Sequence, residues 1–478
     1  MYSVRWNDKI SPLLFCCREV TDGLRTNAGI DAKRAELFEG ESVPRAIAKL
    51  SIPTILSQII TMIYNLADTF FVGHTGDPCQ VAALTLVFPL YMLLTGVGNL
   101  FGIGANSKIS RCLGCRDIDG AHQTAAFTFL GGLACTALML LLIGSSLSTI
   151  LRAMGASNDT LGPAKAYLVW VLLVGGIPTE ASLLLAHMLR GEGRTAEAGT
   201  GMMLGGVLNM ILDPIFIFGL EMGVGGAGLA TMLSNVACLL WYCFVLWRHR
   251  EGSVIRIGPK HFSFFHAKEI LLVGLPAAMV IALGSSANIV LTRLLSGYGD
   301  LPVAAFGVTQ KFGTITMNLS IGLTQGIMPL IGYHYAAGNS RKVREICRVS
   351  CRILFCFVAC LFLLYQAMPL TLVRLFVSDD ATAVLGSGFL RRYSLCIPGM
   401  TFIFLFNSIF QAMGLWKRSL LITVLRQAGL FIPITILLDH WVGLYGIVWA
   451  QPIADTLSFA FTFILMLYTL KNQSSILD

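Results

Sequence analysis

Two carboxylates in the first half of the chain, Asp68 and Asp213, each lie inside a long apolar stretch. Tyr64 precedes Asp68 by one helical turn, and Asn209 precedes Asp213 by one turn, so each pair shares a helix face. Two acids with amide and hydroxyl partners in apolar surroundings can take up and release a proton, because repulsion and desolvation favour one neutral carboxyl group. The same oxygens could instead ligate a Na⁺ ion.

Two prolines lie on the helices expected to carry these acids. Pro214 directly follows Asp213 and cannot donate a backbone hydrogen bond, so it leaves a carbonyl oxygen free one turn earlier. Pro53 lies in the same stretch as Asp68, where we expect it to let the helix bend. The alternative interpretation is that both acids only cap or hold helices near the outer membrane interface.

Composition indicates which solvent surrounds these residues. Hydrophobic residues make up 55% of the chain, charged residues 13%, and the mean hydropathy is +0.73. Soluble domains carry about 25% charged residues, so the low charge and high hydropathy of this chain indicate a membrane protein. Twelve apolar runs are each long enough to cross a hydrocarbon core of ~30 Å, and they are continuous rather than alternating. The sequence therefore predicts an all-α membrane protein with twelve transmembrane helices.

The chain also contains an internal repeat. Pro53–Asp77 is echoed by Pro276–Asp300, 223 residues later, with Thr69 and Thr292 in register. Since six helices per repeat is an even number, both repeats enter the membrane from the same face. We therefore expect two six-helix lobes related by a pseudo-twofold axis along the membrane normal, with a binding site where the lobes face each other.

Basic residues predict the orientation of these helices. They gather in alternate breaks between the apolar runs, for example at Lys108, Arg111 and Arg116, and again at Arg341, Lys342, Arg344 and Arg348. The positive-inside rule then places both termini in the cytoplasm, in a plasma (cell inner) membrane. The net charge of +8 follows from this topology, so no nucleic-acid partner is needed to explain it.

The apolar runs and the basic breaks together suggest a division of the chain. We expect a cytoplasmic N-terminal tail at residues 1–45 and an N-lobe at 46–248. A basic cytoplasmic linker at 249–267 leads to a C-lobe at 268–470 and a short cytoplasmic tail at 471–478. We expect the protein to act as a monomer among membrane lipids.

A series of short motifs across both halves resembles the multidrug and toxic compound extrusion (MATE) transporters, and more closely their prokaryotic members. The matching strings are Pro53…Gln58…Asp68-Thr69…Gly73, Gly102 and Gly104, Leu189-Arg190-Gly191-Glu192-Gly193, Asn209…Asp213-Pro214, Gly225-Gly226-Ala227-Gly228, Gln325…Pro329 and Gln411…Gly414 followed by Arg426-Gln427. The resemblance implies a V-shaped, two-lobed exporter driven by proton or sodium antiport. It also implies that coupling residues lie in the N-lobe.

Other polar residues at membrane depth need a reason, because inserting a charge there costs ~2.5–3.5 kcal/mol. Glu180, in the inner half of the fourth span, could receive cytosolic substrate or pass protons, and snorkelling to the interface is the alternative. Lys311, Arg426 and Asp455 are expected to be buried in the C-lobe. They could form an ion pair, Asp455 with Arg426 or Lys311, or contact substrate directly.

Neutral polar residues are further candidates for a substrate cavity. They are amides that could donate and accept hydrogen bonds inside the lobes: Gln58, Gln310, Gln325, Asn407 and Gln411. No ATP-binding loop, metal centre or Ser/His/Asp arrangement is present in the sequence, so we expect no enzyme and no cofactor beyond the coupling ion.

The expected function is secondary active antiport that exports organic, cationic and amphipathic drugs or toxins in exchange for H⁺ or Na⁺. The alternative is a lipid or lipid-linked oligosaccharide flippase of the same superfamily, an option that Lys311 and Arg426 keep open. Flippases of that kind are expected, by resemblance, to have a strongly basic central cavity. Here acidic and basic membrane residues are mixed.

Overall fold

The computed structural model describes residues 36–377 and 379–477, and every regular element in that part of the chain is a helix. Of the predicted N-terminal tail, residues 1–35 lie outside the described residues. Its last part contains a short π-helical segment, η1 (Glu36–Gly40). The predicted C-terminal tail continues the last helix, which runs to Leu477.

The first lobe contains six spans. Five of them are α3 (Val43–Gly73), α4 (Pro78–Gly114), α5 (Ile118–Ser145), α9 (Thr195–Pro214) with its extension η3 (Ile215–Gly219), and α10 (Gly223–Arg248). The fourth span is assembled from α7 (Asn158–Leu168), η2 (Val169–Val174) and α8 (Gly176–Gly191), and it is bent by 50°. A short helix, α6 (Leu147–Ala153), precedes it.

The second lobe repeats this order. Its spans are α11 (Ala267–Ser296), α12 (Asp300–Ala336), α13 (Ser340–Ala367), the pair α15 (Asp380–Tyr393) and α16 (Cys396–Ala412), the run α17 (Trp416–Val424), η5 (Leu425–Phe431) and α18 (Ile432–Val442), and α19 (Leu444–Leu477). The α15–α16 pair is bent by 49°. The short helices are α14 (Pro369–Arg374) and, between the lobes, η4 (Pro259–His261).

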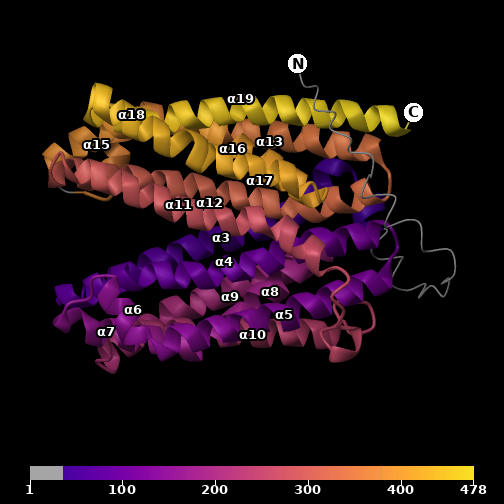
Figure 1. Ribbon diagram of the computed structural model, residues 1–478, viewed down its shortest axis with the longest axis horizontal. Helices are drawn as coiled ribbons and strands as arrows, with labels where there is room; N and C mark the ends of the chain where they lie inside the picture. The colour runs from indigo at the N-terminus through magenta and orange to yellow at the C-terminus, as the bar shows by residue number, and fades with distance from the viewer. Residues whose placement is uncertain (1–35, 378, 478) are drawn as a thin grey trace, which may run out of the picture.

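These elements confirm the prediction of twelve transmembrane helices in two lobes. Among the described residues, nine helices are long and apolar enough to cross a membrane, and the two bent pairs supply two more spans. The twelfth span is α12, which is long enough to cross at 37 residues but is not among the helices that are apolar enough by composition. Figure 1 shows the two lobes side by side, with α3 and α4 of the first lobe facing α11 and α12 of the second.

The lobes touch through the halves of these helices that the predicted orientation places on the cytoplasmic side, called here the inner halves. Across α3 and α12, the Thr54 hydroxyl donates to the Gly322 carbonyl at 2.6 Å. Across α4 and α16, the Ser107 hydroxyl donates to the Gln411 carbonyl at 2.6 Å. Glycines let the backbones approach this closely, as is usual where membrane helices pack. The molecule is therefore closed at its inner end.

Charged side chains join the same inner contact. Lys108 and Arg111 of α4 both bind Glu269 of α11, and the Lys108–Glu269 distance is 2.8 Å. Lys108 and Arg111 are buried, whereas Glu269 is about one-third exposed. One carboxylate thus holds two cations of the opposite lobe at the inner ends of their helices.

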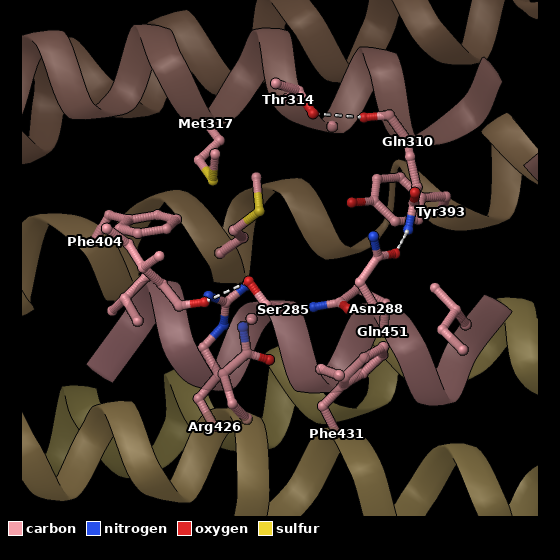
Figure 2. Close-up of a pocket in the computed structure, with 18 of the residues that line it drawn as sticks. Ser285, Asn288, Gln310, Thr314, Met317, Tyr393, Phe404, Arg426, Phe431 and Gln451 are labelled. Atoms are coloured by element: carbon pink, nitrogen blue, oxygen red, sulfur yellow. Dashed lines mark hydrogen bonds between the residues drawn. The ribbon is translucent and has the colours of Figure 1, made fainter. Parts of the chain in front are cut away.

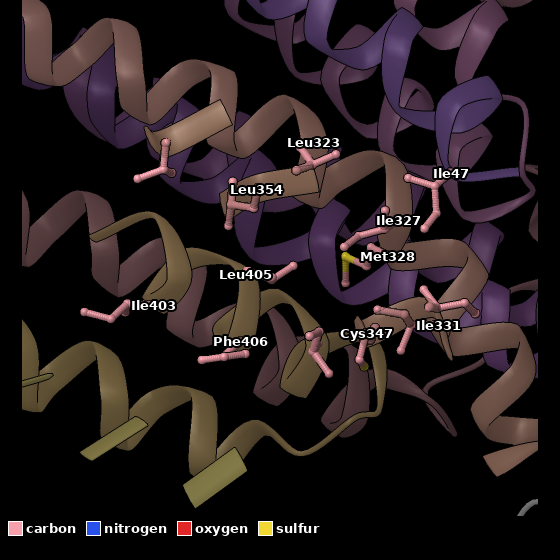
Figure 3. Close-up of a cluster of buried hydrophobic side chains, with 14 of the residues drawn as sticks. Ile47, Leu323, Ile327, Met328, Ile331, Cys347, Leu354, Ile403, Leu405 and Phe406 are labelled. Atoms are coloured by element: carbon pink, nitrogen blue, oxygen red, sulfur yellow. The ribbon is translucent and has the colours of Figure 1, made fainter. Parts of the chain in front are cut away.

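The hydrophobic core of the second lobe reaches across to the first. Figure 3 shows Leu323, Ile327 and Ile331 of α12 packed with residues of α13 and α16, with Ile47 of α3 at the edge of the same cluster. Phe38 of η1 adds to this contact by stacking on Tyr333, with ring centroids 4.6 Å apart. The start of the first lobe is therefore anchored in the second.

Candidate functional site

The structure brings the two acids of the N-lobe together. Asp68 on α3 and Asp213 on α9 are 8% and 0% exposed, and their carboxyl groups lie within hydrogen-bonding reach of each other. Glycines on α9 allow this approach: a Cβ on Gly206 would stand 2.7 Å from Ile60 Cγ2 of α3, and one on Gly199 would stand 2.7 Å from the Pro53 carbonyl oxygen. Two carboxyl groups this close cannot both ionise at low cost.

An amide and a hydroxyl complete the pair. Asn209 Nδ2 donates to Asp213 Oδ1 at 3.3 Å and lies 3.4 Å from the hydroxyl of Thr231 on α10. Three buried oxygens of the site, Asp68 Oδ1, Asp213 Oδ2 and Asn209 Oδ1, have no hydrogen-bond partner among the described residues. A proton or a hard cation would satisfy such oxygens, because buried polar atoms are otherwise almost always paired.

Three tyrosines surround the acids. Tyr64 is one turn from Asp68 and interacts with Tyr91 of α4, and both phenols are electrostatic neighbours of Asp68. Tyr167 of α7 lies near both acids. The sequence indicates Tyr64, one turn from Asp68, but not Tyr91, Tyr167 or Thr231. Single aromatic and hydroxyl residues are common in membrane helices, so no signal in the sequence singles these three out.

The two prolines occupy distinct positions around the site. Pro53 lies inside the continuous helix α3, at the point where α9 and α12 both touch it: its carbonyl faces Gly199, and the next residue, Thr54, bonds to Gly322. Pro214 ends α9, and the chain continues as the π-helical η3. A proline removes the i→i−4 hydrogen bond and so permits such a change of helix type.

Glu180 lies in α8, just after the bend in the fourth span, and it is fully buried. Neither carboxyl oxygen has a hydrogen-bond partner among the described residues, and a Cβ on Gly98 of α4 would stand 3.1 Å from Glu180 Oε2. The side chain therefore points into the α4–α8 contact, and the predicted alternative of snorkelling to the interface is wrong.

Replacing Glu180 by leucine is expected to stabilise the protein, because a buried carboxyl group without a partner costs ~1–3 kcal/mol. Thermal unfolding in detergent should show a higher midpoint for Glu180→Leu than for wild type, with Glu180→Gln in between. A lower midpoint for the leucine variant would mean that Glu180 holds the helices together. Reduced drug efflux in a stabilised variant would assign the residue to function.

The C-lobe contains a cavity of about 380 Å³ between α11, α12 and η5, which Figure 2 shows with its polar lining. Gln310 donates to Asn288 at 3.2 Å on one side. Arg426 lies on the other side, where its Nε is 2.6 Å from Asp455 Oδ1. Gln451 also donates to Asp455, at 2.8 Å. Met92 of α4 reaches the cavity, which therefore borders the first lobe.

The structure separates the predicted C-lobe residues into two groups. Arg426 and Gln310 line the cavity, and Asp455 lies behind Arg426 as its ion-pair partner. The prediction that Lys311 is buried is wrong: it is exposed on α12, with its ammonium 6.0 Å from the centroid of the Phe376 ring. Residues on a helix can be assigned a depth from the sequence, but the direction they face depends on its neighbours.

The remaining amides do not line this cavity. Asn407 and Gln411 of α16 are buried against α17, where both bond to Ser419. Gln58 of α3 and Gln325 of α12 are half-buried, and neither is part of the cavity wall. The amide groups of Asn407 and Gln411 are therefore explained by hydrogen bonds between α16 and α17, without a substrate.

The fold and this site define a two-lobed helical membrane protein with a buried acid pair in one lobe, and comparisons with known proteins agree. The MatE family model matches residues 53–215 and 276–437, once in each lobe. The multidrug export protein MepA of Staphylococcus saprophyticus is 30% identical over 445 residues, covering 92% of this chain and 96% of the relative.

Solved structures agree as well. Crystal structures of MATE in the straight and bent conformations match with TM-scores of 0.87 and 0.86, each at 26% identity and covering 93% of this chain and 99% of the other. The chain belongs to the MatE family of membrane transporters. Members of this family are transporters and not enzymes.

Proposed function

We propose that the protein is a secondary active antiporter that exports organic, cationic and amphipathic compounds in exchange for H⁺ or Na⁺. The observation that carries this proposal is the contact between Asp68 and Asp213, with three buried oxygens left unpartnered around them. The name of the relative MepA, a multidrug export protein, supports drug export as the direction of transport. The basic residues Lys108, Arg111, Arg341 and Arg344 at the inner ends of their helices support placement in the cell membrane with that end toward the cytoplasm.

The acid pair suggests how ion and cargo could compete. When one acid is ionised, the site attracts a positive charge, and the nearby Tyr64 and Tyr91 are aromatic residues of the kind that bind organic cations. A proton or Na⁺ bound by the acids removes that charge and satisfies the free oxygens. Cargo and coupling ion would then exclude each other, as antiport requires.

A bend of α3 is the proposed link between this competition and release. Pro53 lies at the contact of α3 with α9 and α12, so a bend there would change both contacts. Crystal structures of a relative in straight and bent conformations support two states of this fold. Protonating one acid would exchange the repulsion between the Asp68 and Asp213 carboxylates for a shared hydrogen bond, and this change in the α3–α9 contact would allow α3 to change shape.

The C-lobe gives less support to the flippase alternative. A basic cavity would suit a lipid phosphate, but the Arg426 charge is neutralised by Asp455 and Lys311 does not line the cavity. This arrangement suits neutral hydrogen bonding better than the binding of an anion.

The test is ethidium transport by everted membrane vesicles under an imposed pH gradient or an imposed sodium gradient. We expect one of the two gradients to raise wild-type transport at least ~10-fold above the rate measured without a gradient. We expect Asp68→Asn to lose that response, since the amide cannot exchange a proton. Asp439→Asn is the control: this half-buried acid lies on α18 of the other lobe, where it accepts a hydrogen bond from Tyr298. A wild-type transport rate that is unchanged by either gradient would refute the antiport. A wild-type response in Asp68→Asn would refute the assignment of ion coupling to the acid pair.

A further inference from the structure

The linker between the lobes is folded against the first lobe. Ser253 Oγ and Val254 N both donate to the Glu192 carboxylate, at 2.9 and 2.7 Å. Further along, Phe262 packs on Phe127 of α5 with ring centroids 6.0 Å apart. The segment between α10 and α11 therefore has a fixed shape at the inner end of the N-lobe.

A cavity of about 480 Å³ lies between this linker and the last turns of α10. Part of its wall is apolar, formed by Leu246, Ile255 and Ile257, and its rim carries Arg250 and other basic residues. The complete basic set is Arg250, Arg256, Lys260 and His261. Glu251 is the single acidic residue between Arg248 and Lys268 in the sequence, and it does not line the cavity.

The charges on the rim are available to a ligand. Arg250, Arg256 and Lys260 are exposed, and none of them forms an ion pair with a described residue. Three cations around one opening, without a carboxylate among them, create a positive potential that an anion would satisfy. Guanidinium groups in particular bind phosphate oxygens through paired hydrogen bonds.

Apolar side chains lead from this opening along the membrane-facing side of α10. Leu240, Phe244 and Trp247 are 63%, 45% and 67% exposed, and their spacing puts them on one stripe of the helix. Phe264 and Phe265 of the linker, which follow His261 of the cavity by three and four residues, are 71% and 70% exposed. Aromatic residues beside a cluster of basic residues are typical of the level at which lipid headgroups lie.

We propose that this cavity binds the headgroup of an anionic phospholipid of the inner leaflet. Its phosphate would lie among Arg250, Arg256 and Lys260, and an acyl chain would follow the stripe of Leu240, Phe244 and Trp247. The stripe is the reason to favour a lipid over free phosphate, because a small anion needs no apolar surface. The bound lipid would hold the linker against the end of α10, and this role does not depend on the antiport.

The test uses tryptophan quenching in vesicles of phosphatidylethanolamine containing either brominated phosphatidylglycerol or brominated phosphatidylcholine. The chain has seven tryptophans, so the contribution of Trp247 is taken as the difference between wild type and Trp247→Phe. We expect that difference to show several-fold stronger quenching by the anionic lipid. The triple variant R250Q/R256Q/K260Q should lose the preference, while R250K/R256K should keep most of it.

A second triple variant controls for charge in general. R341Q/R344Q/R348Q removes the same charge from exposed positions on α13, and we expect it to leave the preference unchanged. Equal quenching by both lipids in wild type, or equal loss in the two triple variants, would overturn the proposal. Displacement of the lipid by inorganic phosphate alone would also overturn it, since the site would then be one for a small anion. Equal unfolding midpoints confirm that the variants are folded.

Discussion

Gly274→Ala is expected to prevent closure of the inner end and to abolish transport. A methyl group at position 274 of α11 would overlap the backbone carbonyl of Leu100 on α4, and one at Gly104 of α4 would overlap the carbonyl of Ile270. Backbone atoms of packed helices cannot move aside as a side-chain end can, so the lobes must separate instead. We expect both alanine variants to favour the state that is open toward the cytoplasm.

Gly96→Ala is the matched control, because it lies on α4 as well and its Cβ would meet no atom within 4 Å. Glycine-to-alanine changes inside helices otherwise stabilise by about 1 kcal/mol, so a general effect on helix stability would appear in the control too. Spin labels on the inner ends of α4 and α11 should report a longer distance in Gly274→Ala and Gly104→Ala only. Wild-type distances and efflux in these two variants would show that the inner contact is not required.

Breaking the buried ion pair of the C-lobe is expected to have the largest effect on stability. Arg426 and Asp455 are 8% and 0% exposed and share two hydrogen bonds, at 2.6 and 3.3 Å. Arg426→Met would leave a buried carboxylate with Gln451 as its remaining partner, which we expect to cost ~3–5 kcal/mol. Thermal unfolding in detergent should show a clearly lower midpoint.

The double variant Arg426→Met/Asp455→Leu distinguishes the loss of the ion pair from the cost of leaving one buried charge without its partner. Since replacing both members of a buried pair by apolar residues is often neutral, we expect it to recover most of the wild-type midpoint. A double variant as unstable as the single one would show that Arg426 acts through other contacts, such as the ring of Phe404 at 5.4 Å. Because Arg426 lines the cavity, we expect drug efflux by the double variant to stay impaired even where its unfolding midpoint returns to that of wild type.

The acid pair could be predicted from the sequence for a definite reason. Charged residues are rare in apolar runs, and helical spacing places Tyr64 beside Asp68 and Asn209 beside Asp213 without any knowledge of packing. Thr231, which completes the site, comes from another helix, and only the packing of α9 on α10 reveals it. The twelve spans were predictable because length and apolarity set them.

Features that depend on rotation or on local helix type were not predictable. Lys311 has the depth of a buried residue but is exposed on α12, with its ammonium 6.0 Å from the centroid of the Phe376 ring. The bend in the fourth span follows a π-helical turn, in which Gly175 N donates to Trp170 O at 2.8 Å. Nothing in the apolar pattern distinguishes such a turn from a continuous helix.

The hydroxyl-to-carbonyl bonds that join the lobes set an energy scale for the transport cycle. Thr54 and Ser107 donate to carbonyls of the opposite lobe, and each such bond contributes only ~0.5–1.5 kcal/mol. One monovalent ion crossing a membrane potential of ~100 mV releases about 2.3 kcal/mol. Two such bonds are comparable to the work that one ion would deliver under the proposed antiport, so they could break and re-form in every turnover without nucleotide hydrolysis. The Glu269 ion pairs and the packed helices of the same contact add to the work that opening requires.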